Sequence, residues 1–211
     1  MAPLLLQLGL APRIGVLLFA FALLASGCGQ NAKLPPLPAD AVVLAFGDSL
    51  TYGTGASEEE SYPAQLARLT GRRVLREGVP GEVSAAGLAR LPALLDAHRP
   101  RLLLLCHGGN DFLRRLPKAQ AAENVLAMVR LAKDRGIDVL LIGTPEIGFT
   151  LTPPEFYAGI AKQSAIPYEG DVLTKILRNS ELKSDQIHPN AKGYRLMAER
   201  VAELLKKSGA I

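Results

Sequence analysis

The chain has 211 residues, of which 48% are hydrophobic and 21% charged, and its formal net charge at pH 7 is +4. This composition is typical of one globular domain and excludes wholesale disorder and collagen-like repeats. Two cysteines exclude a disulfide framework, and three histidines leave little material for a metal cluster. The positive charge forms no basic run and Trp is absent, so nucleic acid is not expected as a partner.

Residues 1–27 predict a secretory signal peptide. Arg13 is their only charged side chain, and the eleven residues 14–24 that follow carry no polar side chain. A charge, a short apolar core and a small-residue cleavage region are the parts of such a signal. A helix of that length would cover about 16 Å, which is well short of the roughly 30 Å of bilayer hydrocarbon.

This segment ends in Leu-Ala-Ser-Gly-Cys, which resembles the bacterial lipobox. The resemblance implies cleavage before Cys28, lipidation of its thiol, and attachment to a membrane of the bacterial cell envelope, with Gly29 permitting sorting to the outer membrane. Residues 28–40 then predict a lipidated, Pro-rich tether, and residues 41–211 a single domain. A plain signal peptide with an incidental cysteine and an uncleaved membrane helix are the alternatives.

Short apolar runs alternate with helical patterns along the rest of the chain. The runs at 41–46, 72–75, 101–106 and 138–142 predict strands that are buried on both faces. Helices are predicted at 62–70, 84–99, 119–135 and 191–207. This alternation predicts an α/β fold with one doubly wound parallel sheet covered by helices on both sides. In such sheets ligands bind beyond the carboxyl ends of the strands.

The candidate catalytic residues lie at those carboxyl ends. Ser49 lies in Gly-Asp-Ser-Leu after the first strand, Gly81 in a turn after the second, and Asn110 in Gly-Gly-Asn-Asp after the third. Asp185 and His188 form Asp-x-x-His, shortly before the last predicted helix. Because the carboxyl ends of parallel strands share one edge of the sheet, the blocks that follow them are expected to converge.

These residue types suit nucleophilic catalysis by a serine. A serine hydroxyl needs a base, and an imidazole is suitable because histidine titrates near neutral pH. His188 in turn needs an acceptor on its other nitrogen, and Asp185 reaches it through a tight turn. The backbone N–H groups of Ser49 and Gly81 and the amide of Asn110 would supply three donors for a tetrahedral oxyanion.

In their order and composition the four blocks resemble the GDSL/SGNH hydrolase family. The resemblance implies a flavodoxin-like sheet in a three-layer α/β/α arrangement, and a Ser49–His188–Asp185 triad that works without a cofactor or metal. Residues 86–95 are similar to the bacterial thioesterase I/lysophospholipase/arylesterase branch. This implies a serine esterase that hydrolyses aryl esters, short-to-medium acyl esters, thioesters or lysophospholipids through an acyl-serine intermediate.

Several apolar residues near these blocks have two interpretations. Phe112, Leu113 and Leu116 either line an acyl pocket or belong to the core, and the loop 149–154 either caps the same cleft or does not. Cys106 is predicted to be a buried small residue, and His107 a packed histidine.

Two other functions and the oligomeric state remain open. An O-acetylesterase acting on a cell-envelope polysaccharide would need the same triad. A non-catalytic binding protein on the same scaffold would not need the intact blocks.

Overall fold

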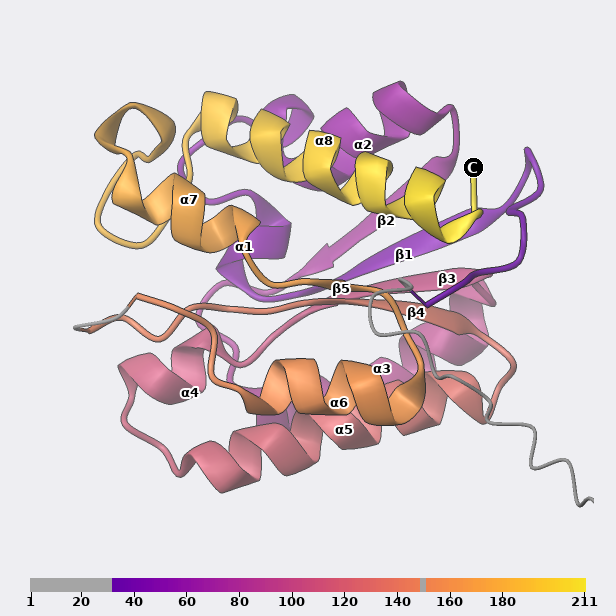
Figure 1. Ribbon diagram of the computed structural model, residues 1–211, viewed down its shortest axis with the longest axis horizontal. Coiled ribbons are helices and arrows are strands. Elements are labelled where there is room, and N and C mark those ends of the chain that lie inside the picture. Colours follow the sequence, from indigo (N-terminus) through magenta and orange to yellow (C-terminus); the bar gives the residue numbers. More distant parts are fainter. Residues whose placement is uncertain (1–31, 149–150) are drawn as a thin grey trace, which may run out of the picture. The chain divides into compact units, whose positions relative to one another are not determined.

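The computed structural model describes residues 32–148 and 151–211, and these belong to the unit Asn31–Ile211 (Figure 1). The predicted signal peptide and Cys28 lie outside the described residues. Within the described ranges, every helix is too short or too polar to cross a bilayer.

Five parallel strands form one sheet in the order β2-β1-β3-β4-β5. In chain order the strands are β1 (Val42–Gly47), β2 (Arg73–Gly78), β3 (Leu102–Cys106), β4 (Asp138–Ile142) and β5 (Tyr168–Glu169). The central strand β3 is wholly buried and purely apolar except for its last residue, as expected for a strand covered on both faces. The edge strand β2 is half polar, and the apolar pattern therefore predicts only its first part.

Helices cover both faces of the sheet (Figure 1). One face carries α2 (Tyr62–Thr70), α7 (Val172–Arg178) and α8 (Ala191–Ser208). The other face carries α3 (Ser84–His98), α5 (Lys118–Lys133) and α6 (Phe156–Ser164). The predicted doubly wound parallel sheet is confirmed.

Side chains alternate along each strand between two hydrophobic cores. Val43 and Ala45 of β1 belong to the core under α2, α7 and α8, whereas Leu44 and Phe46 belong to the core under α3, α5 and α6. Cys106 is fully buried in the first core, as predicted, and burial raises the pKa of its thiol. Two-sided burial fixes the register of the sheet and therefore the positions of the residues at its carboxyl edge.

Four short elements complete the domain: α1 (Ser49–Tyr52), the 3₁₀ turns η1 (Glu58–Glu60) and η2 (Ser180–Leu182), and α4 (Gly109–Leu113). Both α1 and α4 begin within three residues of a strand end. They are too short for a helical period to be visible in the sequence.

Part of the predicted tether packs on the domain. Residues 32–40 contain no helix or strand, but Leu34 and Leu37 are buried in the core beside α8. Their backbone N–H groups donate to the carbonyl oxygens of Ser208 and Ala210 at 2.9 and 2.8 Å. Leu34 and Leu37 therefore pack as part of the domain, although the sequence pattern assigns them to the tether.

Candidate active site

Ser49 is placed by the tight turn from β1 into α1. Gly47 ends β1 so close to β3 that a Cβ there would lie 2.1 Å from the carbonyl oxygen of Cys106. Asp48 then caps α1, accepting a 3.0 Å hydrogen bond from the backbone N–H of Leu50. Ser49 is the first residue of α1, so its own N–H has no partner within the helix and is available to an anion.

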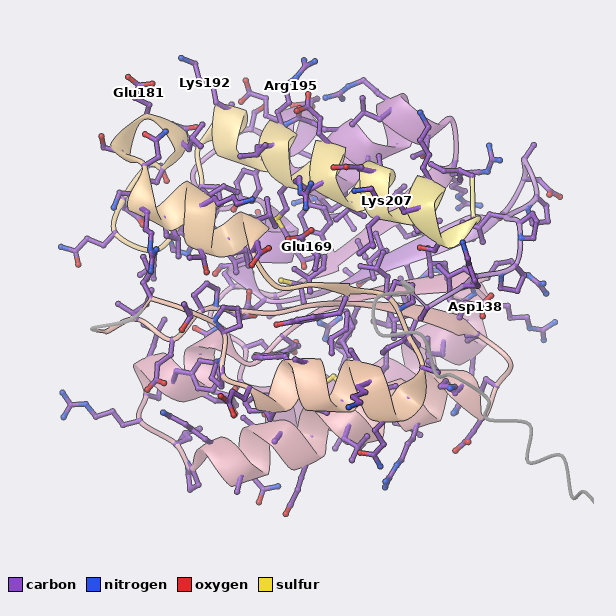
Figure 2. All side chains as sticks on the ribbon, in the orientation of Figure 1. Asp138, Glu169, Glu181, Lys192, Arg195 and Lys207 are labelled. Atoms are coloured by element: carbon purple, nitrogen blue, oxygen red, sulfur yellow. The ribbon has the colours of Figure 1, made fainter. Side chains whose placement is uncertain are left out.

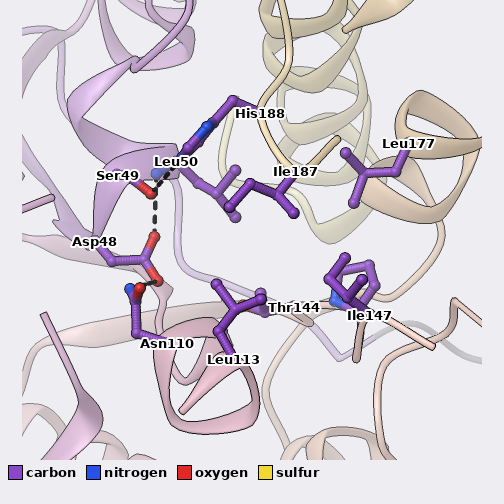
Figure 3. A pocket seen from close by; sticks show the side chains of 12 residues that line it. Asp48, Ser49, Leu50, Asn110, Leu113, Thr144, Ile147, Leu177, Ile187 and His188 are labelled. Carbon is purple, nitrogen blue, oxygen red and sulfur yellow. Dashed lines mark hydrogen bonds between the residues drawn. The ribbon is translucent and has the colours of Figure 1, made fainter. Parts of the chain in front are cut away.

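Ser49, His188 and Asp185 form a continuous chain of hydrogen bonds (Figure 3 shows the first two residues). His188 Nε2 lies 3.0 Å from Ser49 Oγ, and His188 Nδ1 lies 2.8 Å from Asp185 Oδ2. Since Oδ2 of an ionised carboxylate only accepts, Nδ1 carries the proton and Nε2 presents its lone pair to the serine hydroxyl. This is the tautomer that a general base requires.

The carboxylate of Asp185 also organises the loop on which His188 lies. Its Oδ1 accepts hydrogen bonds from the backbone N–H groups of Ile187 and His188, both at 2.8 Å. Partial burial acts to raise the pKa of Asp185, but the hydrogen bonds from His188 and the two N–H groups outweigh it and lower the pKa. Asp185 is therefore ionised at neutral pH.

Asn110 occupies the opposite side of Ser49, in α4. Its amide nitrogen donates to Asp48 Oδ2 at 3.1 Å and to the backbone carbonyl of Glu82 at 3.0 Å. Asp48 is 2% exposed, and this burial raises the pKa of its carboxyl group. The arrangement holds the Asn110 amide beside Ser49 between two fixed acceptors.

Gly81 lies in a turn closed by a 3.1 Å hydrogen bond from the N–H of Glu82 to the carbonyl of Val79. Its φ is +77°, which with Pro80 before it indicates a type II turn that glycine favours. Its carbonyl accepts a 2.8 Å hydrogen bond from Arg114. Gly81 is not among the residues that line the pocket described below, so its predicted role as an oxyanion donor stays a prediction.

A hollow of about 370 Å³, open solvent included, lies beside Ser49 (Figure 3). Its polar wall is formed by Asp48, Ser49, Asn110, Thr144 and His188. Its apolar wall is formed by Leu50, Leu113, Pro145, Ile147, Leu177 and Ile187. A nucleophile at the edge of an apolar hollow suits a substrate with a polar reacting group and a hydrocarbon arm.

The structure brings only one of the three predicted pocket residues into this hollow. Leu113 lines it and is 45% exposed. Phe112 instead lies in the core, with its ring centroid 6.2 Å from that of Phe156 and 6.5 Å from that of Tyr157. Leu116 is 40% exposed but is not part of the lining. In a short helix, successive residues point in different directions, so neighbours in sequence do not share one wall.

Five of the six apolar residues of the pocket were not predicted from the sequence: Leu50, Pro145, Ile147, Leu177 and Ile187. The position of Ile187 could have been predicted, because this residue lies between Asp185 and His188 in sequence and is carried to the site with them. The position of Leu177 could not, since nothing in the sequence directs α7 toward the pocket. Of the predicted capping loop, residues 149–150 lie outside the described residues and 151–154 do not line the hollow.

Known proteins resemble this chain over most of its length. The family model of the GDSL-like lipase/acylhydrolase family matches residues 45–196. Esterase TesA of Pseudomonas aeruginosa is 32% identical over 198 residues, covering 88% of this chain and 98% of TesA. The thioesterase 1/protease 1/lysophospholipase L1 of Escherichia coli K12 is 30% identical over 172 residues, covering 78% and 83%.

Solved structures agree with these sequence matches. A crystal structure of TesA superposes with a TM-score of 0.68 at 29% identity, covering 78% of this chain and 98% of that one. A psychrotrophic esterase, EstA from Pseudoalteromonas sp., has the same TM-score at 25% identity, covering 80% and 98%. Together with the strand-end blocks and the sheet that positions them, these matches show that the chain belongs to the GDSL-like lipase/acylhydrolase family.

Proposed function

We propose that this protein is a serine esterase that hydrolyses acyl esters and thioesters, with Ser49 as nucleophile. The observation that carries the proposal is the 3.0 Å contact between Ser49 Oγ and the unprotonated nitrogen of His188, itself oriented by Asp185. Relatives named esterase, arylesterase and thioesterase 1/lysophospholipase L1 support this reaction class. No cofactor or metal takes part in the proposed steps.

In the first half-reaction Ser49 Oγ attacks the acyl carbonyl carbon while its proton passes to His188 Nε2. The carbonyl π electrons move to oxygen and form the tetrahedral oxyanion. When the oxyanion collapses, the bond to the leaving oxygen or sulfur breaks. His188 donates its proton to that leaving group, so that an alcohol or thiol departs and an acyl-serine remains.

In the second half-reaction water replaces the leaving group. His188 accepts a proton from water as the water oxygen attacks the acyl-serine carbonyl, and it returns that proton to Ser49 Oγ when the ester bond breaks. The carboxylic acid is released and the free enzyme is restored. Asp185 stays ionised throughout and stabilises the imidazolium that forms in each step.

The oxyanion is stabilised by three N–H donors near Ser49. These are the first N–H of α1, at Ser49, together with the N–H of Gly81 and the amide of Asn110. Both Asn110 amide hydrogens have acceptors in the free enzyme, on Asp48 and on the Glu82 carbonyl. The hydrogen on the Asp48 side is therefore shared with the oxyanion, while the hydrogen bond to Glu82 holds the amide plane.

The apolar wall of the pocket favours a hydrocarbon acyl chain over an acetyl group as the preferred substrate. Six apolar side chains line it, from α1, α4, α7 and the loops after β4 and before α8. Each buried CH₂ contributes about 0.8 kcal/mol, so kcat/KM should rise with chain length until the pocket is filled.

Nitrophenyl esters of rising acyl length test both the reaction and the substrate class. We expect kcat/KM to increase from acetyl toward medium chains, and Ser49→Ala to be inactive on all of them. Turnover of the acetyl ester alone, with acetate release from envelope glycan, would favour the O-acetylesterase instead. Failure of a fluorophosphonate to label Ser49 in the folded protein would favour a non-catalytic binding protein.

The proposal also includes lipidation of Cys28 and a place in the bacterial cell envelope. Its support is the lipobox-like sequence that ends at Cys28. Cells that express the full chain should incorporate labelled palmitate into it and retain it in the membrane fraction, whereas Cys28→Ala should lose both properties. Equal labelling of the two proteins would overturn the lipidation.

A further inference from the structure

Behind the turn that carries Gly81 lies a network of charged and polar groups that the proposed chemistry does not use. The side chain of Glu82 is 8% exposed and that of His107 is fully buried. Arg90, on α3, donates from Nε to Glu82 Oε1 at 3.0 Å and from a terminal nitrogen to Oε2 at 2.8 Å. This two-point contact fixes the carboxylate in position and orientation.

His107 holds the same carboxylate from the other side. Its Nδ1 accepts a 3.0 Å hydrogen bond from the N–H of Gly108, so in the neutral ring the proton lies on Nε2. Nε2 lies 3.1 Å from Glu82 Oε2 and donates to it. The guanidinium of Arg90 stacks on Phe46, 4.3 Å from its ring centroid.

The fold reserves space for this network. Gly87, one turn into α3, faces the imidazole of His107, and a Cβ at Gly87 would lie 2.3 Å from Nε2. A side chain at this position would displace His107 from Glu82.

Glu82 connects the network to the oxyanion donors. It directly follows Gly81, and its backbone carbonyl accepts the 3.0 Å hydrogen bond from the amide of Asn110. A second contact joins the same two segments. Asp111 accepts hydrogen bonds from the backbone N–H and from the hydroxyl of Ser84, at 2.8 and 2.6 Å. Two contacts thus join the segment after β2 to the segment after β3, one between Glu82 and Asn110 and one between Ser84 and Asp111.

We propose that Glu82 is a positioning residue for the oxyanion donors. Its carboxylate, held by Arg90 and His107, fixes the backbone that carries the Gly81 N–H and the carbonyl that orients Asn110. The inference rests on the proposed function, in which those two groups bind the oxyanion. The oxyanion is absent from the bound substrate and forms only in the tetrahedral intermediate and the transition states on either side of it. Loss of this support therefore lowers kcat and leaves KM nearly unchanged.

Glu82→Gln is the direct test, because it keeps the size of the side chain and removes its charge. We expect kcat per fluorophosphonate-titrated active site to fall about 10- to 100-fold, since a displaced donor loses part of the 10²–10³-fold effect of a deleted one. KM should change less than about threefold. The inhibition constant of an alkylboronic acid, whose adduct places an oxygen in the oxyanion position, should rise by the same factor as kcat falls.

Asp96→Asn is the matched control. Asp96 lies on the same helix as Arg90 and also accepts from an arginine, Arg135 Nε at 2.9 Å, but near the end of α3 that is distant from the pocket. We expect its kcat and its inhibition constant to equal those of the wild type. If Glu82→Gln keeps kcat per titrated site within about threefold and only lowers stability, the network is structural and the inference is overturned.

The variants of His107 provide a second test that holds even where Glu82→Gln does not fold. His107→Leu removes the donor to Glu82 and should lower kcat per titrated site about tenfold, whereas His107→Gln keeps an N–H donor and should recover most of that loss. Equal rates in both variants would overturn the inference. Failure of the proposed function is distinguishable, because Ser49→Ala would then hydrolyse the ester as fast as the wild type.

Discussion

Ser49 is half-buried at the start of α1, and its hydroxyl contacts the imidazole of His188 rather than the core. Ser49→Ala should therefore abolish ester turnover while changing the free energy of unfolding by no more than about 0.5 kcal/mol. Nitrophenyl ester hydrolysis and urea denaturation measure the two quantities. Turnover at the wild-type rate would exclude Ser49 as the nucleophile.

Asp185 sets the tautomer of His188 through the 2.8 Å contact at Nδ1. Asp185→Asn replaces an acceptor by a group that also donates, and it favours the wrong tautomer. We expect kcat to fall about 10³- to 10⁴-fold at neutral pH, because the wrong tautomer leaves Ser49 without a base. Because Asp185 is 52% exposed at its side chain, the stability should change little. A loss below tenfold would contradict the assigned role.

The pH dependence of kcat/KM should have a single acid limb. The pKa of Asp185 is lowered by its hydrogen bonds with His188 and two backbone N–H groups, despite the opposing effect of partial burial, so this carboxylate stays ionised well below neutral pH. The imidazole of His188 must be neutral to accept the proton of Ser49, so protonation of this ring removes the base. kcat/KM should therefore decrease toward acid pH with a slope of one proton. A flat profile or a two-proton slope would be inconsistent with this.

At the scale of the element, α8 and the loop before it depend on Asn190. Its side-chain oxygen caps α8 by accepting from the N–H of Gly193 at 3.1 Å, and its amide donates to the carbonyl of Glu181 at 2.9 Å. Asn190→Ala should lower the free energy of unfolding by about 1–2 kcal/mol. Lys192→Ala, on the exposed side of the same helix (Figure 2), is the control and should change it by less than about 0.5 kcal/mol. Urea denaturation compares the two, and equal losses would contradict the capping role.

Some helices and strands were predicted from the sequence and others were not, because only some of them carry a repeating pattern. The apolar run of β3 and the amphipathic pattern of α8 were visible because burial imposes a period on many residues in a row. The short helices α1 and α4 exist because Asp48 and Gly108 turn the chain at a strand end, which is a local event without a period.

At the scale of the whole molecule, the contacts of Glu82 with Arg90 and His107 make the free energy of unfolding depend on pH. Burial alone would raise the pKa of Glu82, but the hydrogen bonds and charges of His107 and Arg90 lower the pKa from 4.5 to about 2. A lowered pKa means that the contribution to stability is complete above the ordinary value and is lost as the pH falls from about 4.5 toward 2. The stability difference between wild type and Glu82→Gln should therefore be larger at pH 6 than at pH 3. Urea denaturation at both values measures it, and an unchanged difference would contradict the ion pair.

The sequence allowed the sheet and the Ser49 block to be predicted because parallel strands carry the residues that follow them to one edge. It allowed Asp185 and His188 to be predicted because a serine nucleophile needs a base with an acceptor beside it. It did not allow the partners of His107 to be predicted. Glu82 and Arg90 are distant from His107 in sequence, and their contact arises only when α3 packs on the sheet. The apolar wall was hidden for the same reason, since Leu177 reaches the pocket only through the packing of α7.

The segment 32–40 and the pocket lie at opposite ends of the sheet. Leu34 and Leu37 are hydrogen-bonded to the C-terminal end of α8, near the residue where β1 begins. Ser49 lies just beyond the last residue of β1, which is about 20 Å further along for a six-residue strand. A molecule attached to a bead through a residue of the segment 32–40 would thus be held at the end of the sheet opposite its catalytic mouth. Pulling on that attachment would first load the hydrogen bonds from Leu34 and Leu37 to the end of α8, which lie far from the triad.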